Sequence, residues 1–162
     1  MALDLQSGKL IDPYLGEQDI KNRCLKIVFN QAFDEDPLRL LRAVQFAARF
    51  NLKINDHTFN LMQQHAAKII SVSPERIVEE VKKLLSAPKP SLGFDIMRET
   101  GLLHHLFPEV EKMIGSLQPP KHGGDVYTHT MRVLDAARSH QDLDNPGDLD
   151  TMFAALFHDL GK

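Results

Sequence analysis

An acidic and a guanidinium side chain stand three positions apart in the stretch FDEDPLRLLRAVQFAARF, residues 33–50. Asp36 and Arg39 flank Pro37 at what reads as the start of a helix, so their side chains should lie about 60° apart around its axis. A carboxylate only accepts hydrogen bonds and a guanidinium only donates them. Together they complement a base edge with an amino group beside a ring nitrogen, as in cytosine and adenine. The spacing therefore indicates a base-reading pair.

An ordinary helix start explains the same residues and stays open. Aspartate is a good N-cap, Glu35 suits a helix N-terminus, and an acid–arginine pair three residues apart is common on helices. Arg42 lies on nearly the same face, one turn further on, where it could reach a phosphate or the same base.

A second group of chemically capable residues stands near the other end of the chain. VYTHTMRVLDAA places His129 on one predicted helix, and ALFHDLGK places His158 and Asp159 at the end of another. Neutral imidazoles and a carboxylate can bind a divalent metal whose bound water attacks a phosphate ester. A histidine and an aspartate that merely hydrogen-bond at a helix end are the alternative.

Composition limits the class of protein. With 162 residues, 43% of them hydrophobic and 25% charged, the chain can form one or two globular domains. It contains neither an apolar stretch of membrane-spanning length nor a signal-peptide pattern, so no membrane contact and a cytoplasmic location are expected. Cys24, the single cysteine, reads as a small core residue. The oligomeric state stays open.

Charge gives no general preference for nucleic acid. The net charge is −3, and residues 121–162 carry four basic and seven acidic side chains, so any grip on RNA must be local. Phosphates of an RNA 3′ end would be held by basic groups in the first two thirds of the chain. The candidates are Arg39, Arg42, Arg49, Lys68, Lys82 and Lys83, although lysines on a helix face are usually only solvated.

The periodicity predicts a mainly α-helical fold. Pro13 and Gly16 should interrupt the N-terminal segment, and a short helix leading into a strand is favoured around residues 24–29. Residues 36–50 form the clearest helix, with Asp36 as N-cap, Pro37 as first residue and an apolar surface that includes Phe50. Further helices are expected at 56–67, 73–85, 90–100, 104–113, 126–139 and 148–160, with a loop at 115–124.

These motifs resemble a known family in order along nearly the whole chain. EDPLRLLRAVQFAARF is similar to the motif that opens the neck domain of class II tRNA nucleotidyltransferases, which are the CCA-adding enzymes and the bacterial poly(A) polymerases. SPERIVEEVKKLL is similar to a later neck motif, and GLLHHLFPEV to the end of the neck. The resemblance implies that residues 1–30 end a catalytic head, 31–115 form the neck, and 116–162 begin an HD domain.

The resemblance also implies roles for particular residues. Asp36 and Arg39 would hydrogen-bond the incoming CTP or ATP, Glu35 would hold the arginine, and Arg42 would contact the nucleotide. Arg76 and Glu80 would support this helix. His129, His158 and Asp159 resemble part of the HD phosphohydrolase site, for which the implied cofactor is a divalent metal.

One part of the family's machinery has no counterpart in this sequence. Transfer of CMP and AMP, or of AMP alone, to a tRNA or other RNA 3′ end needs Mg²⁺ on two carboxylates beside a Gly-rich loop. No such arrangement precedes residue 35, so this chain by itself is expected to be inactive. Two other hypotheses remain: an HD-type metal phosphohydrolase, and a non-catalytic helical module that binds nucleotide or RNA.

Overall fold

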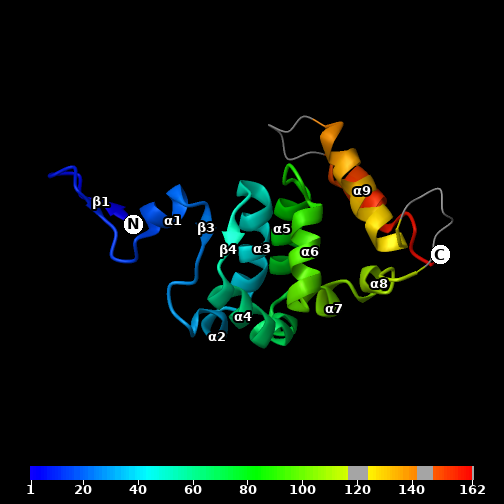
Figure 1. Cartoon of the computed structure of the whole chain (residues 1–162), viewed down its shortest axis with the longest axis horizontal. Helices are drawn as coiled ribbons and strands as arrows, with labels where there is room; N and C mark the ends of the chain where they lie inside the picture. The colour runs from blue at the N-terminus through cyan, green and yellow to red at the C-terminus, as the bar shows by residue number, and fades with distance from the viewer. Residues whose placement is uncertain (117–123, 142–147, 162) are drawn as a thin grey trace.

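The computed structural model describes residues 1–116, 124–141 and 148–161. Within these ranges the protein is mainly α-helical, as the sequence predicts, and has two two-stranded sheets (Figure 1). The elements are β1 (Ala2–Leu3), β2 (Leu10–Ile11), α1 (Gly16–Lys21), β3 (Cys24–Leu25), α2 (Ala32–Glu35), α3 (Leu38–Phe50), β4 (Lys53–Ile54), α4 (Asp56–His65), the 3₁₀ helix η1 (Ala66–Ser71), α5 (Pro74–Leu85), α6 (Ser91–Thr100), α7 (Leu102–Leu106), α8 (Pro108–Glu111), α9 (Val126–Ser139) and α10 (Leu149–Phe157). In this described part, no helix is both long and apolar enough to cross a membrane.

Helix α3 is the centre of the core, because apolar side chains cover most of its circumference. Leu40, Leu41 and Val44 have no exposed surface, and α3 packs against α5 and α6 (Figure 1). The prediction of a buried helix is confirmed. The prediction that Phe50 belongs to its apolar stripe is wrong, since Phe50 is 49% exposed. It is the last helical residue, and Asn51 then turns the chain with a φ of 49°.

Several helix boundaries differ from those predicted. Helix α3 begins at Leu38 with Pro37 as its N-cap, one residue later than expected, although the Asp36 carboxylate still accepts the Leu38 N–H at 3.2 Å. Helix α4 takes its cap from Asn55, whose side chain accepts the N–H of Thr58.

The segment 104–113, predicted as one helix, is divided between α7 and α8. Pro108 begins α8, because a proline has no N–H to continue a helix but suits a first helical position. Helix α9 has the predicted bounds, whereas α10 is shorter than predicted at both ends. The expected loop at 115–124 and the turn before α10 fall largely on residues 117–123 and 142–147, outside the described part.

The strand predicted around residues 24–29 is only two residues long. Cys24 and Leu25 pair in parallel with Lys53 and Ile54, and the Ile27 N–H then bonds the Thr58 hydroxyl at 2.8 Å instead of a neighbouring strand. Cys24 is half-buried, so it is not the core residue that was expected. Helix α1 begins at Gly16, where the sequence predicts an interruption.

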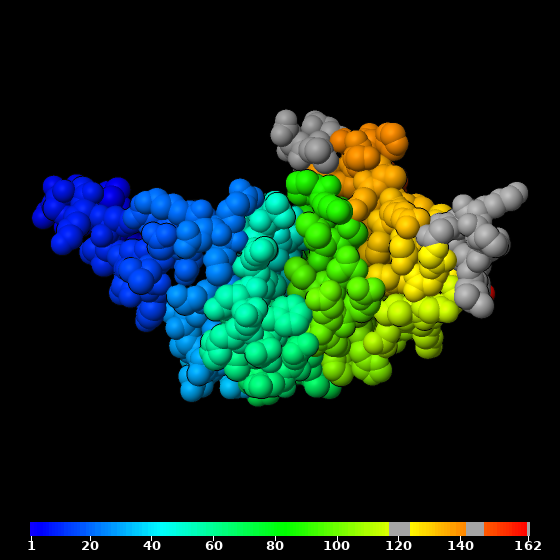
Figure 2. Space-filling view, viewed as in Figure 1, coloured from blue at the N-terminus to red at the C-terminus, as the bar shows by residue number. Residues whose placement is uncertain are grey.

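Helix α9 is fastened to the central helices by polar contacts. The Asp135 carboxylate accepts the backbone N–H of Ser91 at 3.0 Å and its hydroxyl at 2.6 Å, at the start of α6. The fully buried Arg138 donates from Nε to the Ser86 carbonyl at 3.2 Å. In the space-filling view the segments from α5 to α9, coloured green to orange, form one continuous body, and the N-terminal hairpin projects from the opposite end (Figure 2).

Candidate nucleotide-binding site and metal centre

Arg39 is held at the mouth of α3 by groups from the preceding short helix. Its Nη1 donates to the Ala32 carbonyl at 3.0 Å and to the Glu35 carboxylate at 3.0 Å. Its guanidinium also lies over the Phe29 ring, 5.7 Å from the ring centroid. The side chain keeps 40% of its surface exposed. These contacts fix the direction of the guanidinium and leave other N–H groups for a ligand.

Asp36 has a different partner. Both of its carboxylate oxygens accept from Nη2 of Arg76 on α5, at 3.1 and 2.9 Å, and one of them also accepts the Leu38 N–H. Asp36 and Arg39 therefore belong to separate networks and do not form an ion pair with each other. The Asp36 side chain is 26% exposed, so neither group of the predicted pair is sealed inside the core. The contact with Arg76 agrees with the supporting role that the resemblance implies for that arginine.

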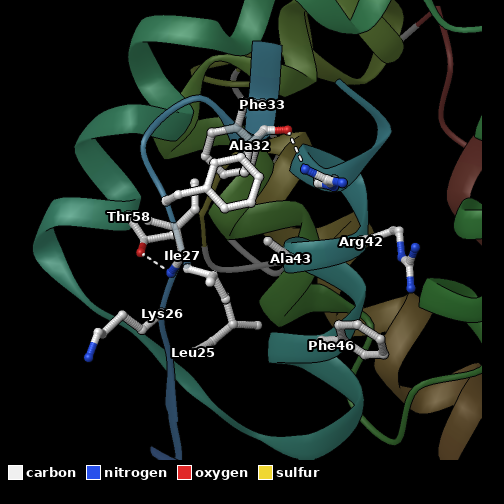
Figure 3. Close-up of a pocket in the computed structure, with 12 residues that line it drawn as sticks. Leu25, Lys26, Ile27, Ala32, Phe33, Arg42, Ala43, Phe46 and Thr58 are labelled. Atoms are coloured by element: carbon white, nitrogen blue, oxygen red, sulfur yellow. Dashed lines mark hydrogen bonds between the residues drawn. The ribbon is translucent and has the colours of Figure 1, made fainter. Parts of the chain in front are cut away.

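A cavity of about 450 Å³ lies beside Arg39, between the β3–α2 segment and α3. Its wall is largely apolar, with Phe29, Phe33 and Phe46 among the lining side chains and with three cations, Lys26, Arg39 and Arg42. Figure 3 shows Phe33, Ala43 and Phe46 around this cavity, and a dashed line from the Ala32 carbonyl to a guanidinium. Asp36 does not line it. Arg42 lies over Phe46 at 5.9 Å.

The phenylalanines of this cavity were missed by the sequence analysis. A flat apolar wall next to charged donors suits a heterocyclic base, because bases stack on aromatic rings. The available signal was the recurrence of Phe29, Phe33 and Phe46 among the arginines of one short segment.

Short helix α2, which supplies the partners of Arg39, is itself anchored to the next elements. The Asp34 carboxylate binds Lys68 of η1 and lies 3.2 Å from Nε2 of His65. The pKa of Asp34 is lowered from its ordinary value, mainly by the hydrogen bond from Lys68, with desolvation opposing it and the charges of Lys68 and His65 adding to it. The other nitrogen of His65 lies 2.9 Å from the Leu61 carbonyl.

The lysines considered for an RNA grip have carboxylate partners. Lys68 binds Asp34, Lys82 bonds Glu79 at 2.8 Å, and Lys83 bonds Glu80 at 2.8 Å. Glu80 is buried, and its second carboxylate oxygen has no hydrogen-bond partner among the described residues. Arg49 instead donates to the neutral Gln45 side chain at 3.4 Å and lies over Phe50.

The three residues of the predicted metal site come together. One ligand atom from each of His129, His158 and Asp159 lies within 4.8 Å of the others. Asp159 is 3% exposed; its two oxygens lie 3.9 Å from Nε2 of His129 and 3.3 Å from Nε2 of His158. The rings of the two histidines are 5.5 Å apart and tilted by 60°.

The donor chemistry of this group fits a divalent cation. Nδ1 of His158 lies 2.8 Å from the Ala155 carbonyl, which accepts a hydrogen bond from that nitrogen and so leaves the lone pair of Nε2 for a metal ion. A backbone carbonyl on the outer nitrogen is the usual support of a metal-binding histidine. Two imidazoles and one carboxylate are three ligands of the type that zinc, manganese and iron sites use.

Comparison with known proteins shows which proteins this chain resembles. Residues 51–114 match a family model described as "Probable RNA and SrmB- binding site of polymerase A". The Multifunctional CCA protein of Actinobacillus pleuropneumoniae serotype 5b is 40% identical over 96% of this chain, which covers 39% of that protein. The chain thus spans about two fifths of the length of this curated relative.

Solved structures of the same class share the fold. The Thermotoga maritima CCA-adding enzyme complexed with tRNA_CCA superposes with a TM-score of 0.67 at 25% identity, over 92% of this chain and 34% of that one. A CCA-adding enzyme with ATP gives a TM-score of 0.65 at 25% identity, again over 92% of this chain and 34% of that one. In fold, the chain thus resembles a segment of the CCA-adding enzymes. More particularly, nearly the whole chain is similar in sequence to about two fifths of the Multifunctional CCA proteins.

Proposed function

We propose that this chain is the neck and the beginning of the HD domain of an enzyme that adds CMP and AMP, or AMP alone, to RNA 3′ ends, and that α3 selects CTP and ATP. The observation that carries the proposal is the fixed guanidinium of Arg39 at the mouth of α3, held by Glu35 and Ala32 beside an aromatic cavity. Like the cytoplasmic location, the domain boundaries at residues 30 and 115 stay predictions.

Selection of the base follows from the directions of the hydrogen bonds. The N–H groups of Arg39 that are not engaged by Glu35 donate to the ring nitrogen and carbonyl acceptors of cytosine or to a ring nitrogen of adenine. Asp36 accepts from the amino group of either base; its oxygens keep lone pairs beyond those that Arg76 and Leu38 use. Guanine and uracil present a ring N–H to Arg39 and a carbonyl to Asp36, so both contacts become repulsive.

Glu35 and Arg42 have supporting parts in the same site. Glu35 is a positioning residue, because it binds Arg39 and is not among the residues that line the cavity. Arg42, stacked on Phe46 at the cavity edge, supplies charge for a phosphate. Mg²⁺, when bound to the head carboxylates of such an enzyme, would activate the RNA 3′ hydroxyl and neutralise the triphosphate.

Nucleotide binding by the chain tests this proposal. Isothermal titration should show tighter binding of CTP and ATP than of GTP and UTP, and Arg39→Ala should abolish the preference. Arg98→Ala is a matched control, because Arg98 is a similarly exposed arginine on α6, 3.8 Å from Asp95. Equal affinity for all four nucleotides in the unaltered chain would refute base selection by α3.

The group of His129, His158 and Asp159 supports a second, separate proposal. We propose that it binds a divalent cation in the HD part of the protein, where the cation would supply a bound water of lowered pKa. His158 and His129 would each offer Nε2 and Asp159 an oxygen. The comparisons do not favour a free-standing phosphohydrolase or a non-catalytic module as the function of the chain.

Metal binding can be measured without any catalytic assay. Titration with Mn²⁺, Ni²⁺ or Zn²⁺ should give one site per chain and a rise in melting temperature, and His158→Ala should remove both. His140→Ala, which changes an exposed histidine at the end of α9, should leave them unchanged. Metal binding that survives His158→Ala would contradict this assignment.

A further inference from the structure

A second cavity adjoins the first at the C-terminal end of α3. It has a volume of about 640 Å³. Phe46 lines both cavities. Two arginines, Arg23 and Arg49, and a second phenylalanine, Phe50, complete its polar and aromatic wall. The nucleotide site proposed above does not use this cavity.

The two cavities concentrate positive charge in a chain whose net charge is −3. Their walls include Lys26, Arg39 and Arg42 in the first and Arg23 and Arg49 in the second, and neither wall includes an aspartate or glutamate. Lys26 and Arg39 pair with Asp19 and Glu35, which lie outside the walls. Among the described residues, no carboxylate forms a salt bridge with Arg23, Arg42 or Arg49. Guanidinium groups stay charged at every physiological pH, so this surface retains unneutralised charge that a polyanion can compensate.

Each wall of the second cavity is held in place by local contacts. Arg23 donates to the Phe50 carbonyl at 2.6 Å and to the Asn51 carbonyl at 3.4 Å, which also places its charge at the negative end of α3. Arg49 lies over the Phe50 ring at 5.3 Å and donates to Gln45 at 3.4 Å. Capping of α3 explains the contacts of Arg23, but it does not explain why a half-exposed Phe50 lies beside two cations.

Aromatic rings beside arginines are the elements that bind single-stranded nucleic acid. Bases stack on the rings, and guanidinium groups meet the phosphates or stack on the bases. We propose that the second cavity binds the terminal nucleotide at the 3′ end of single-stranded RNA, with Phe50 as stacking surface and Arg49 as phosphate contact. This inference rests on the proposed function, because an enzyme that joins a nucleotide to an RNA end must bind the incoming nucleotide and the RNA 3′ end in adjoining sites. Phe46, common to the two cavities, separates them.

The residues that carry this inference lie just before the part of the chain matched by the RNA-binding family model. That match covers residues 51–114; it includes Asn51 and Leu52 of the cavity wall, whereas Arg49 and Phe50 precede it. The alternative is that the second cavity holds the triphosphate of a nucleotide whose base lies in the first cavity. The two occupants are separated by measuring RNA and CTP on the same variants.

Fluorescence anisotropy with a short labelled single-stranded RNA of free 3′ hydroxyl tests the proposal on the whole chain. Phe50→Leu should weaken RNA binding about fivefold or more, the lower end of the effect of one base–aromatic stack. Arg49→Gln should lower the slope of log affinity against log salt by about 0.7, the value for one phosphate contact on a single strand. Arg98→Gln on α6 is the control and should change neither quantity. Circular dichroism melting checks that each variant is folded.

The outcomes separate this inference from the proposed function. Weakened RNA binding in Phe50→Leu and Arg49→Gln, with CTP affinity retained, supports the second cavity as the RNA site. If CTP binds and the RNA affinity is the same in all variants, or if no RNA binds, the inference is wrong and base selection by α3 stands. If Arg49→Gln weakens the binding of CTP and leaves the binding of RNA unchanged, the second cavity holds the triphosphate and the inference is again wrong. A chain that binds RNA in the expected manner but no nucleotide refutes the proposed function alone.

Discussion

The helix-mouth site and the metal group differ in how their residues are brought together. Ala32, Glu35, Asp36 and Arg39 lie within one short stretch of chain, and the side chains of the three charged residues are partly exposed. His129 and His158, by contrast, come from different helices, α9 and the end of α10, and Asp159 between them is nearly fully buried. Arg39 therefore depends on hydrogen bonds within one stretch of chain, and Asp36 also on Arg76 of α5, whereas the metal group depends on the packing of two helices.

Both regions should nevertheless fail together when the common core is damaged. Leu41→Ala removes a fully buried side chain of α3 and should lower the free energy of unfolding by about 3–5 kcal/mol, because a cavity remains where the side chain was. Chemical denaturation followed by circular dichroism measures this change. Ile70→Ala, at a side chain that is 72% exposed, should change it by less than about 0.5 kcal/mol. A loss below about 1 kcal/mol for Leu41→Ala would show that α3 is not the centre of the core.

Removal of the hydrogen bonds that join α9 to α6 should have the next largest effect. Asp135→Ala removes the acceptor of two hydrogen bonds from Ser91 and should lower the free energy of unfolding by about 1–3 kcal/mol, since part-buried donors lose their partner. Asp150→Ala, on the exposed first turn of α10, should cost at most about 1 kcal/mol. If unfolding then shows two transitions, the α9–α10 region is stable without its link to α6; equal effects of the two variants would contradict the importance of the link.

The role of Arg76 can be separated from stability. Arg76→Ala should change the free energy of unfolding by only about 0–1 kcal/mol, because its ion pair with Asp36 is about half exposed on the arginine side. It should weaken the binding of CTP and ATP by several fold, since the Asp36 carboxylate loses the guanidinium that orients it. Isothermal titration and thermal denaturation of the same preparation measure both. Unchanged nucleotide affinity would show that Asp36 needs no support from α5.

The smallest expected effect is a dependence on pH near α2. Since the pKa of Asp34 is lowered in the folded chain, its carboxylate stabilises the fold above the ordinary aspartate pKa, and this contribution is lost as the pH falls through the lowered value. Asp34→Asn should therefore make the fall of melting temperature below about pH 4 less steep. Near neutral pH, the curves of melting temperature against pH for this variant and the unaltered chain should be almost parallel. Asp56→Asn, on exposed α4, is the control. The same acid profile in Asp34→Asn and in the unaltered chain would contradict this contribution.

The sequence predicts more of the helix-mouth site than of its surroundings. Proline at position 37, acids before it and apolar residues after it mark the start of α3 to within one residue, because these signals act within one helical turn. The pairing of Asp36 with Arg76 was not predicted, because that contact joins residues far apart in the chain. The cavity wall was missed for the same reason: Phe29 and Phe46 line one cavity only after the chain has turned through α2.

Residue types and short-range periodicity were enough to predict a mainly helical chain, the position of its central helix, and the two groups of side chains that are candidates for binding nucleotide and metal. Local propensity and hydrogen bonding set those features within a few residues. Only the tertiary structure decided that Arg39 turns to Glu35 and Ala32, that Asp36 turns to α5, and that His129 meets Asp159. Such choices depend on which helices pack together, and packing is settled by the burial of apolar surface over the whole chain.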